Sequence, residues 1–568
     1  MSQEYHVLRP ILPNGVRLIE NVYIPMRDGV KLAVDVYLPE AEGRYPVILS
    51  LSPYKKEAQP GSPIKGYHAE AGEPSFYIPY GYAMVHAQVR GSGMSQGQYN
   101  FYDKTEQKDG YDLVEAIAQQ SWCDGNVGML GGSYLAMSQY YTAAQQPPHL
   151  KCIVPCDGMT DVYRGFAYPG GLFFSGFSAG WTVMVTMDCV WPGPVEGKLP
   201  PAAILADWYR NYEDVPYWQE RRAIDFLDKI KAPVLYIVAG TGFLHSTSQL
   251  HGWPEIKSTK KMLIMFTVPG PFAAVFRHNE PANEYVRRWF DYWLKGIDTG
   301  IMEEPPVAIY DTGTNQWRYE NEYPIARTKW TKYYLRSNSK GTATAPPWGL
   351  ISTEPPVKGE EPEQFKAPRP RPELMANMPV LGYVSDPLDN DVRVQGPLSF
   401  TCYGSSKTED ATPLAWFVRV GDIAPDDNTK MLTFGQLKAS FREINDTMSK
   451  PGQPFRPFQK PVQVKPGEVN EYQIELVPTF HTFKKGHKIW VQIASDDPNF
   501  ELTNAGDLVC GPVPAENAIY HDSEHPSHLL LPVIPDAPEI APVKPPISEI
   551  KLPSKVDIGS AAARGPLG

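Results

Sequence analysis

The sequence predicts an α/β domain built on a mainly parallel sheet, joined to a second, β-rich half. Uninterrupted apolar runs occur at 47–51, 82–85, 127–130, 152–154, 234–238 and 262–266, with helical segments between several of them. Such runs suit strands covered on both faces, and alternation with helices favours a parallel sheet. From about residue 330 the pattern changes to short strands between turns, at 332–335, 398–401, 415–420 and 489–493. A chain of 568 residues also exceeds what one core usually fills, so we expect several domains.

The first half begins with a hairpin and contains three clear helical patterns. At 15–40 an Asp-Gly turn precedes alternating apolar residues, which predicts a strand with one buried face. Apolar stripes at helical spacing predict helices at 110–120, 134–146 and 283–295, and Gly296 ends the last one. We interpret the aromatic stripe of the 283–295 helix as core. The tract 336–375 is rich in Pro, Glu and Lys, which predicts an extended loop.

Residues 157–230 interrupt the rhythm of strands. Their first part is rich in aromatic residues and glycine, and the segment 202–231 has a helical pattern. An insertion at this point of a doubly wound sheet typically forms a lid over the site. We therefore expect a helical cap here, with aromatic side chains that can line an apolar pocket.

A glycine-rich turn at 131–134 carries the clearest catalytic signal. A short buried strand is predicted at 126–130 and a helix from Tyr134, and Ser133 lies between them. A serine on such a strand-to-helix turn is a nucleophile elbow, which exposes the hydroxyl at the top of the sheet. That serine needs a base to take its proton, most often a histidine. The alternative is that Ser133 is a relic without a chemical role.

Two further features belong with Ser133. The backbone amide of Tyr134 heads a helix, where N–H groups lack helical partners and the dipole is positive. Ser52-Pro53-Tyr54 follows the first strongly apolar strand, so the Tyr54 hydroxyl can act as a second donor. Together these donors would stabilise an alkoxide or enolate beside Ser133. Lys55 and Lys56 are interpreted as solvated, with binding of an acidic substrate as the alternative.

These motifs resemble the CocE/NonD hydrolases, the relatives of cocaine esterase and the X-Pro dipeptidyl-peptidases. The resemblance rests first on Gly-Gly-Ser-Tyr-Leu-Ala-Met-Ser-Gln-Tyr at 131–140. It continues at 26–29, 90–93, 147–151, 161–164, 290–296, 485–488 and 527–535, and so covers nearly the whole chain. The family implies an α/β-hydrolase domain, a helical cap and a carboxy-terminal jelly-roll β-sandwich. It also implies an oxyanion hole made by the Tyr54 hydroxyl and the Tyr134 amide.

From this we expect an α/β-hydrolase domain at 1–156 and 231–320, a helical cap at 157–230, a jelly-roll β-sandwich at 321–535 and a proline-rich tail at 536–568. The chain departs from the family where the other two members of a catalytic triad belong. The loop 240–246 contains no Asp or Glu, and the segment 252–277 contains no histidine. A milder departure puts Leu135 where the family pattern has a glycine. The triad is therefore predicted to be degenerate.

Four histidines can be considered as substitutes for the missing base. His245 lies on the loop where the acid should be, and a surface or helix-capping role is its alternative. His278 follows the expected base position by about ten residues. His251 and His86 are weaker candidates.

Three hypotheses follow. In the first, the enzyme uses its oxyanion hole for a non-hydrolytic step on a small carbonyl compound, such as cyclisation, isomerisation, elimination or an aldol-type step, in specialised metabolism. In the second, it is an esterase, amidase or acyltransferase that uses Ser133 with a relocated base, His245 first. In the third, it is a catalytically silent binding protein. Fold alone does not choose among them.

Composition limits the partners. The net charge is −11 and no basic run occurs, which argues against nucleic acid. No apolar stretch of about 20 residues occurs, and the amino terminus has no secretory pattern, so we expect a cytoplasmic protein that does not span a membrane. No CxxC pair occurs, and we expect no metal and no cofactor. The expected partner is a small-molecule substrate, and a homodimer is compatible with the sequence.

Overall fold

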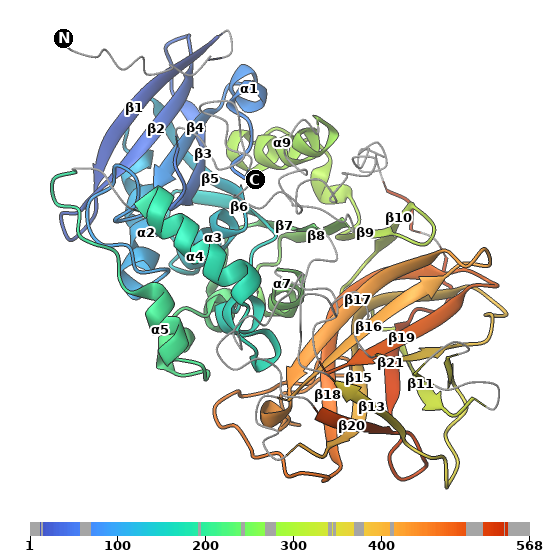
Figure 1. The fold of residues 1–568 in the computed structure, drawn as a ribbon. Helices are drawn as coiled ribbons and strands as arrows, with labels where there is room; N and C mark the ends of the chain where they lie inside the picture. The colour runs from blue at the N-terminus through green and yellow to red at the C-terminus, as the bar shows by residue number, and fades with distance from the viewer. Residues whose placement is uncertain are drawn as a thin grey trace, which may run out of the picture.

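The computed structural model describes residues 12, 15–56, 70–190, 195–239, 245–266, 280–338, 343–344, 348–367, 380–408, 414–495, 515–538 and 540–542. Figure 1 shows two large β structures: the amino-terminal one, in blue and green, carries the long helices, and the carboxy-terminal one, in yellow to red, consists mainly of strands. None of the helices in these described segments is long and apolar enough to cross a membrane.

The amino-terminal sheet has ten strands in the order β1-β2-β4-β3-β5-β6-β7-β8-β9-β10. Neighbouring strands from β4 to β9 are parallel, while β1, β2 and β10 pair in antiparallel fashion. This is the mainly parallel sheet that the sequence predicts. The strands span Val16–Pro25 (β1), Lys31–Pro39 (β2), Tyr45–Ser52 (β3), Ala83–Gln88 (β4), Cys123–Gly132 (β5), Leu150–Cys156 (β6), Val234–Ala239 (β7), Lys261–Phe266 (β8), Val307–Asp311 (β9) and Gln316–Glu320 (β10).

Helices cover both faces of this sheet, which explains its uninterrupted apolar strands. On one face, residues such as Leu49 and Met129 form a core with Met137 of α3 (Tyr134–Ala144). On the other face, alternate residues such as Leu130 pack against Phe290 of α9 (Glu280–Lys295). Because successive side chains of a strand point to opposite faces, most positions of the central strands are buried.

The predicted helices are present, and two of them begin earlier than predicted, α9 by three residues. The helix α3 ends two residues before the predicted end, and α9 ends at Lys295, followed by Gly296 with φ +69°. The helix α2 (Lys104–Ala118) begins six residues earlier than predicted. The reason is a cap: the Asp103 carboxylate accepts hydrogen bonds from the N–H groups of Thr105 and Glu106.

Two expectations about the sheet and the 157–230 insertion need correction. The hairpin of β1 and β2 is present, but the single buried face predicted for its second strand is wrong. Leu32 and Val36 of β2 pack in one core while Tyr37 packs in the other, because β2 lies inside the sheet between β1 and β4. The helical segment 202–231 is not one helix. It consists of α5 (Ile204–Arg210), α6 (Pro216–Gln219) and a 3₁₀ stretch, Ala223–Lys229.

The first part of the insertion forms a helical run of mixed type. A π-helical turn at Tyr163–Ala167 is followed by a run from residue 175 to 190, in which α4 (Gly180–Met184) lies between two π-helical stretches. Shorter helices elsewhere are α1 (Pro74–Tyr77) and α7 (Ser246–Gly252).

The carboxy-terminal half is β-rich, as predicted. Its strands form one hydrogen-bonded network in the order β13-β20-β15-β21-β11-β12-β14-β19-β16-β17, with β18 paired to β15. Two of them, β12 and β13, lie within 336–375, so the prediction of a wholly extended loop there is wrong. The strands span Lys329–Arg336 (β11), Gly349–Ser352 (β12), Glu363–Ala367 (β13), Leu381–Val384 (β14), Val392–Ser406 (β15), Ala415–Ile423 (β16), Thr429–Lys438 (β17), Asn470–Phe483 (β18), Lys488–Ala494 (β19), Ala515–Tyr520 (β20) and His528–Val533 (β21).

Candidate active site

Ser133 stands on a strained turn between β5 and α3. Its backbone has φ 53° and ψ −118°, which is unfavourable for a residue with a side chain. The turn is held by hydrogen bonds from the Ser133 N–H to the Cys156 carbonyl at 3.0 Å and from the Gly132 N–H to the Glu70 carbonyl at 2.8 Å. Gly131 is required, because a Cβ there would lie 2.4 Å from the Cβ of Leu135. The sequence motif therefore folds into the elbow that it predicts.

Tyr54 lies beside this turn because β3 and β5 are parallel neighbours whose carboxyl ends reach the same edge of the sheet. Its side chain is buried, and its ring lies edge-on to that of Tyr134 with the centroids 6.2 Å apart. Burial raises the pKa of Tyr54 well above its usual value, whereas its hydrogen bonds to Trp181 and Ser133 oppose that rise. The phenol therefore keeps its proton at neutral pH and is available as a hydrogen-bond donor.

His245, the residue that precedes α7, reaches Ser133. Its Nε2 atom lies 3.2 Å from the Oγ atom of Ser133. The imidazole is 6% exposed, and this burial lowers its pKa to about 3. The ring is therefore neutral at physiological pH, and one of its two nitrogens is unprotonated and can accept a proton. The same burial makes the imidazolium form expensive, so His245 is a weak base in the resting state.

The structure brings together four of the residues singled out in the sequence, Ser133, Tyr54, Tyr134 and His245. Their catalytic roles stay predictions. The loop segments 240–244 and 267–279, where the family pattern places the acid and the base, lie outside the described residues, and so does His278.

The other histidine candidates have different surroundings. His251, near the end of α7, forms an ion pair with Glu475 of β18, with Nε2 and Oε1 2.5 Å apart. His86 is buried in β4 with its ring 5.1 Å from that of Tyr37. Neither of these described contacts involves Ser133.

The two lysines after Tyr54 differ from each other. Lys56 is 2% exposed and lies 2.8 Å from the Asp35 carboxylate, so its interpretation as a solvated residue is wrong. The Lys56 amine also donates to Oδ1 of Asn21 at 2.7 Å, and Asn21 and Asp35 belong to the paired strands β1 and β2. Lys55 is partly exposed and bonds to Asp188 of the cap.

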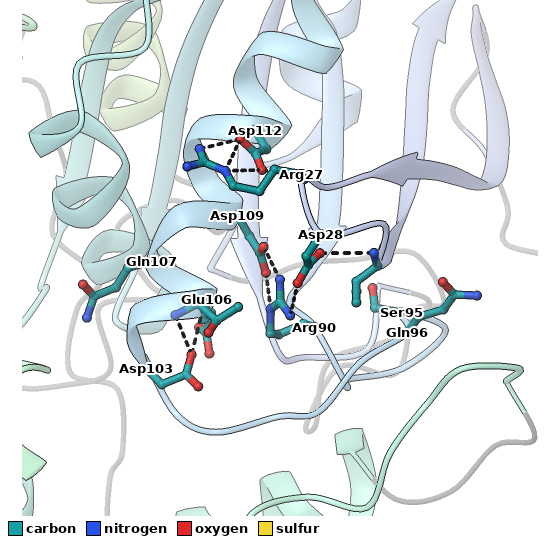
Figure 2. Close-up of polar contacts among 12 residues, drawn as sticks. Arg27, Asp28, Arg90, Ser95, Gln96, Asp103, Glu106, Gln107, Asp109 and Asp112 are labelled. Carbon is teal, nitrogen blue, oxygen red and sulfur yellow. Dashed lines mark hydrogen bonds and ion pairs between the residues drawn. The ribbon is translucent and has the colours of Figure 1, made fainter.

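A buried carboxyl group contacts Tyr134, one of the two predicted oxyanion donors. The Tyr134 hydroxyl donates to Oε1 of Glu106 at 2.6 Å, and the Tyr102 N–H donates to Oε2 at 3.0 Å. The Tyr102 ring stacks on the Tyr134 ring with centroids 4.0 Å apart, and its hydroxyl donates to the Tyr134 carbonyl at 2.7 Å. Burial raises the pKa of Glu106 to about 8. Figure 2 shows Glu106 in the first turn of α2, capped by Asp103, with the Arg90–Asp109 pair further along the helix.

Sequence reasoning missed Glu106 and Trp181. Asp103 followed three residues later by Glu106 is a helix-start signature that could have located the first of them. No local pattern could have located Trp181. This residue of α4 donates its indole N–H to the Tyr54 hydroxyl at 3.0 Å, although 127 positions separate the two in the chain. Among the described residues, no group of three or more His, Cys, Asp or Glu is arranged to hold a metal ion.

Comparison with known proteins identifies the family. The family model of X-Pro dipeptidyl-peptidase (S15 family) matches residues 28–266, and that of the X-Pro dipeptidyl-peptidase C-terminal non-catalytic domain matches residues 299–530. The chain belongs to the CocE/NonD, X-Pro dipeptidyl-peptidase-like family of α/β-hydrolases. Cocaine esterase of Rhodococcus sp. (strain MB1 Bresler) is 27% identical to it, over 90% of this chain and 98% of the relative.

Solved structures agree on the fold of this CocE/NonD member. A CocE/NonD family hydrolase from Staphylococcus aureus superposes with a TM-score of 0.79 at 21% identity, covering 92% of this chain and 98% of its own. An α-amino acid ester hydrolase superposes with a TM-score of 0.71 at 20% identity, covering 94% and 100%. These likenesses confirm the predicted α/β-hydrolase fold with a β-rich carboxy-terminal domain.

Proposed function

We propose that this CocE/NonD family member is a serine esterase, amidase or acyltransferase in which His245 is the relocated base of Ser133. The observation that carries the proposal is the 3.2 Å contact between the Ser133 hydroxyl and Nε2 of a neutral, buried His245. This is hydrogen-bond distance, and the neutral imidazole is the form that accepts a proton. Relatives named as a cocaine esterase and an α-amino acid ester hydrolase support an ester as the first substrate class to test.

Every protein group in the proposed cycle belongs to a described residue. Oγ of Ser133 attacks the substrate carbonyl carbon while its proton passes to Nε2 of His245. The resulting oxyanion accepts hydrogen bonds from the Tyr54 hydroxyl and the Tyr134 N–H. The C–O or C–N bond then breaks, and the proton on His245 passes to the leaving group. Water, or another acceptor in an acyltransferase, attacks the acyl-enzyme by the reverse sequence.

Reaction with a fluorophosphonate tests this proposal, because only an activated serine attacks phosphorus. We expect covalent labelling at Ser133, located by peptide mass spectrometry, and hydrolysis of p-nitrophenyl butyrate by the wild-type protein. Ser133→Ala should abolish the label and lower kcat by about 10⁴-fold or more. A wild-type protein that neither takes the label nor hydrolyses the ester would overturn the proposal.

The second candidate function is a non-hydrolytic step on a small carbonyl compound, such as cyclisation, isomerisation, elimination or an aldol-type reaction. It is favoured by the weak basicity of His245 and by the absence of an acid at 240–246 and of a histidine at 252–277. An oxyanion hole and binding alone leave roughly 10³–10⁴ of acceleration over water, which suffices for a reaction with a modest barrier. For such a non-hydrolytic reaction, the Ser133→Ala variant should retain turnover, whereas the Tyr54→Phe variant should lose it.

A small-molecule substrate follows from either chemistry. A cytoplasmic location, a homodimer and a role in specialised metabolism stay predictions from the sequence. Size-exclusion chromatography with light scattering tests the homodimer directly.

A further inference from the structure

The cap reaches the proposed oxyanion hole through one side chain. Trp181 lies in α4, part of the 175–190 helical run, and its indole N–H donates to the hydroxyl of Tyr54 at 3.0 Å. Tyr54 follows β3 in the hydrolase domain and is buried, whereas Trp181 is partly exposed. The bond therefore joins the inserted cap to a residue at the edge of the central sheet.

This hydrogen bond determines where the proton of Tyr54 can point. An indole N–H is a donor only, so the phenol oxygen must be the acceptor in this pair. The hydroxyl hydrogen of Tyr54 is then directed away from Trp181, toward another acceptor. The phenol oxygen is thereby engaged by the cap, and its hydrogen is left to face an acceptor other than Trp181, such as the carbonyl oxygen of a bound substrate. A donor oriented before substrate binds needs no reorganisation when negative charge develops.

Aromatic packing holds Trp181 in place. Its ring stacks on Tyr134, the residue that supplies the second proposed donor, with centroids 6.1 Å apart and an interplanar angle of 23°. Phe101 and Phe166 contact it edge-on, with centroids at 5.7 Å and 5.2 Å. Such pairs fix the orientation of a ring as well as burying it. One cap residue thus contacts both members of the proposed oxyanion hole.

We propose that Trp181 is a positioning residue that orients the Tyr54 hydroxyl toward the developing oxyanion. The cap then contributes to the rate of the chemical step and does not merely enclose the substrate. This inference rests on the proposed role of Tyr54, and it applies to ester hydrolysis and to an oxyanion-assisted non-hydrolytic step alike.

The test is a double-mutant cycle with p-nitrophenyl butyrate as the substrate. Trp181→Phe removes the N–H and keeps an aromatic ring, so we expect kcat to fall about three- to ten-fold, the range of one net hydrogen bond, while KM changes less than two-fold. In the Tyr54→Phe background the same change should have no further effect, because the hydroxyl that Trp181 orients is gone. Trp208→Phe is the matched control, since Trp208 also packs on Phe101 and Phe166. It should leave kcat within two-fold of the wild type.

Several outcomes would overturn the inference. Equal losses from Trp181→Phe in the wild-type and Tyr54→Phe backgrounds would show that Trp181 acts independently of Tyr54. A rise in KM at unchanged kcat would show that it only binds substrate. A matching loss in Trp208→Phe would show that general packing of the cap is responsible.

Fluorophosphonate labelling separates this inference from the proposed function. If Trp181→Phe retains Ser133 labelling at the wild-type extent and shows the expected fall in kcat, both stand. If the wild type is labelled and active but the cycle is additive, only the role of Trp181 fails. If the wild type is neither labelled nor active, the proposed function fails. Trp181→Phe should then shift the alkaline titration of Tyr54, isolated as the absorbance difference from the Tyr54→Phe variant, to higher pH, because the Trp181 hydrogen bond lowers the pKa of Tyr54. Trp208→Phe should not shift it. An unchanged titration would overturn the orienting contact as well.

Discussion

The two sides of the candidate site are built differently. Tyr54 and Ser133 follow two neighbouring parallel strands, and Tyr134 begins the helix after one of them. Glu106 contacts the side chain of Tyr134, and Trp181 contacts that of Tyr54. On the side of the predicted base, the described residues include His245, which precedes the seven-residue helix α7. That helix follows β7, which β6 separates from β5 in the sheet.

Burial has opposite consequences on the two sides. It raises the pKa of Tyr54, so the hydroxyl remains a donor, and it strengthens hydrogen bonds to a developing oxyanion. It lowers the pKa of His245, so the ring is neutral at physiological pH and can accept a proton, but it is a weak base. In the proposed cycle, burial therefore favours stabilisation of negative charge over transfer of a proton to His245. Five measurements test this contrast.

Substitution of the base should have the largest effect. We expect His245→Gln to lower kcat for ester hydrolysis by about 10²–10⁴-fold, the usual contribution of general-base catalysis. His149→Gln is the control, because His149 forms a partly exposed pair with Glu115 and should change kcat less than two-fold. An active His245→Gln enzyme would mean that the 3.2 Å contact has no role in catalysis.

Removal of one donor should come next. Tyr54→Phe deletes a single hydroxyl, and loss of one oxyanion-hole donor reduces kcat by about 10²–10³-fold. Steady-state kinetics should show this loss with KM nearly constant. If KM rises and kcat does not change, Tyr54 binds the ground state rather than the transition state.

The pH profile should lack the acidic limb of an ordinary histidine base. Because the pKa of His245 is lowered to about 3, its neutral form predominates throughout the range above pH 5. An unperturbed histidine of pKa about 6.5 would lose roughly 30-fold in kcat/KM between pH 8 and pH 5. We expect less than a three-fold loss over this interval. An inflection near pH 6.5 that is lost only in the His245→Gln variant would show that the His245 ring is solvated.

The pH dependence of the stability should reveal the buried carboxyl group of Glu106. Burial raises the pKa of Glu106 from 4.5 to about 8, so the unfolded chain binds fewer protons than the folded protein between these values. Stability therefore falls as pH rises from about 4.5 to about 8. Glu106→Gln should flatten this dependence. The fall in Tm between about pH 4.5 and pH 8 should be a few degrees smaller than in the wild type, at roughly 2–4 °C per kcal/mol. Asp112→Asn, in the exposed pair with Arg27, should not alter it.

The smallest effect is expected at the contact between α7 and the β-rich domain. Glu475 raises the pKa of His251 above its usual 6.5, so the pair stabilises the fold below that pH and loses its contribution as pH rises through the raised value. Glu475→Gln should lower Tm by a few degrees at pH 6 and by less at pH 9, measured by differential scanning calorimetry. The same loss at both pH values would exclude an ionic contribution.

Much of the oxyanion side could be predicted from the sequence, because its residues belong to local patterns. Ser133 sits in a strand-turn-helix motif, and the amide of Tyr134 follows from the helix start. Tyr54 could be assigned through its place after an apolar strand and the family resemblance. The base could only be ranked among four histidines, since proximity to Ser133 depends on how β5, β6 and β7 are ordered in the sheet.

The sequence by itself determined a parallel sheet with a nucleophile elbow, a cap insertion and a β-rich second half. Hydrophobic period and turn chemistry are properties of neighbouring residues, and they survive without knowledge of long-range contacts. The tertiary structure decided that His245 meets Ser133, that Trp181 meets Tyr54 and that Lys56 is buried against Asp35. These contacts join segments 21 to 127 positions apart, and burial, which sets the pKa of His245 and Glu106, exists only once the chain has folded.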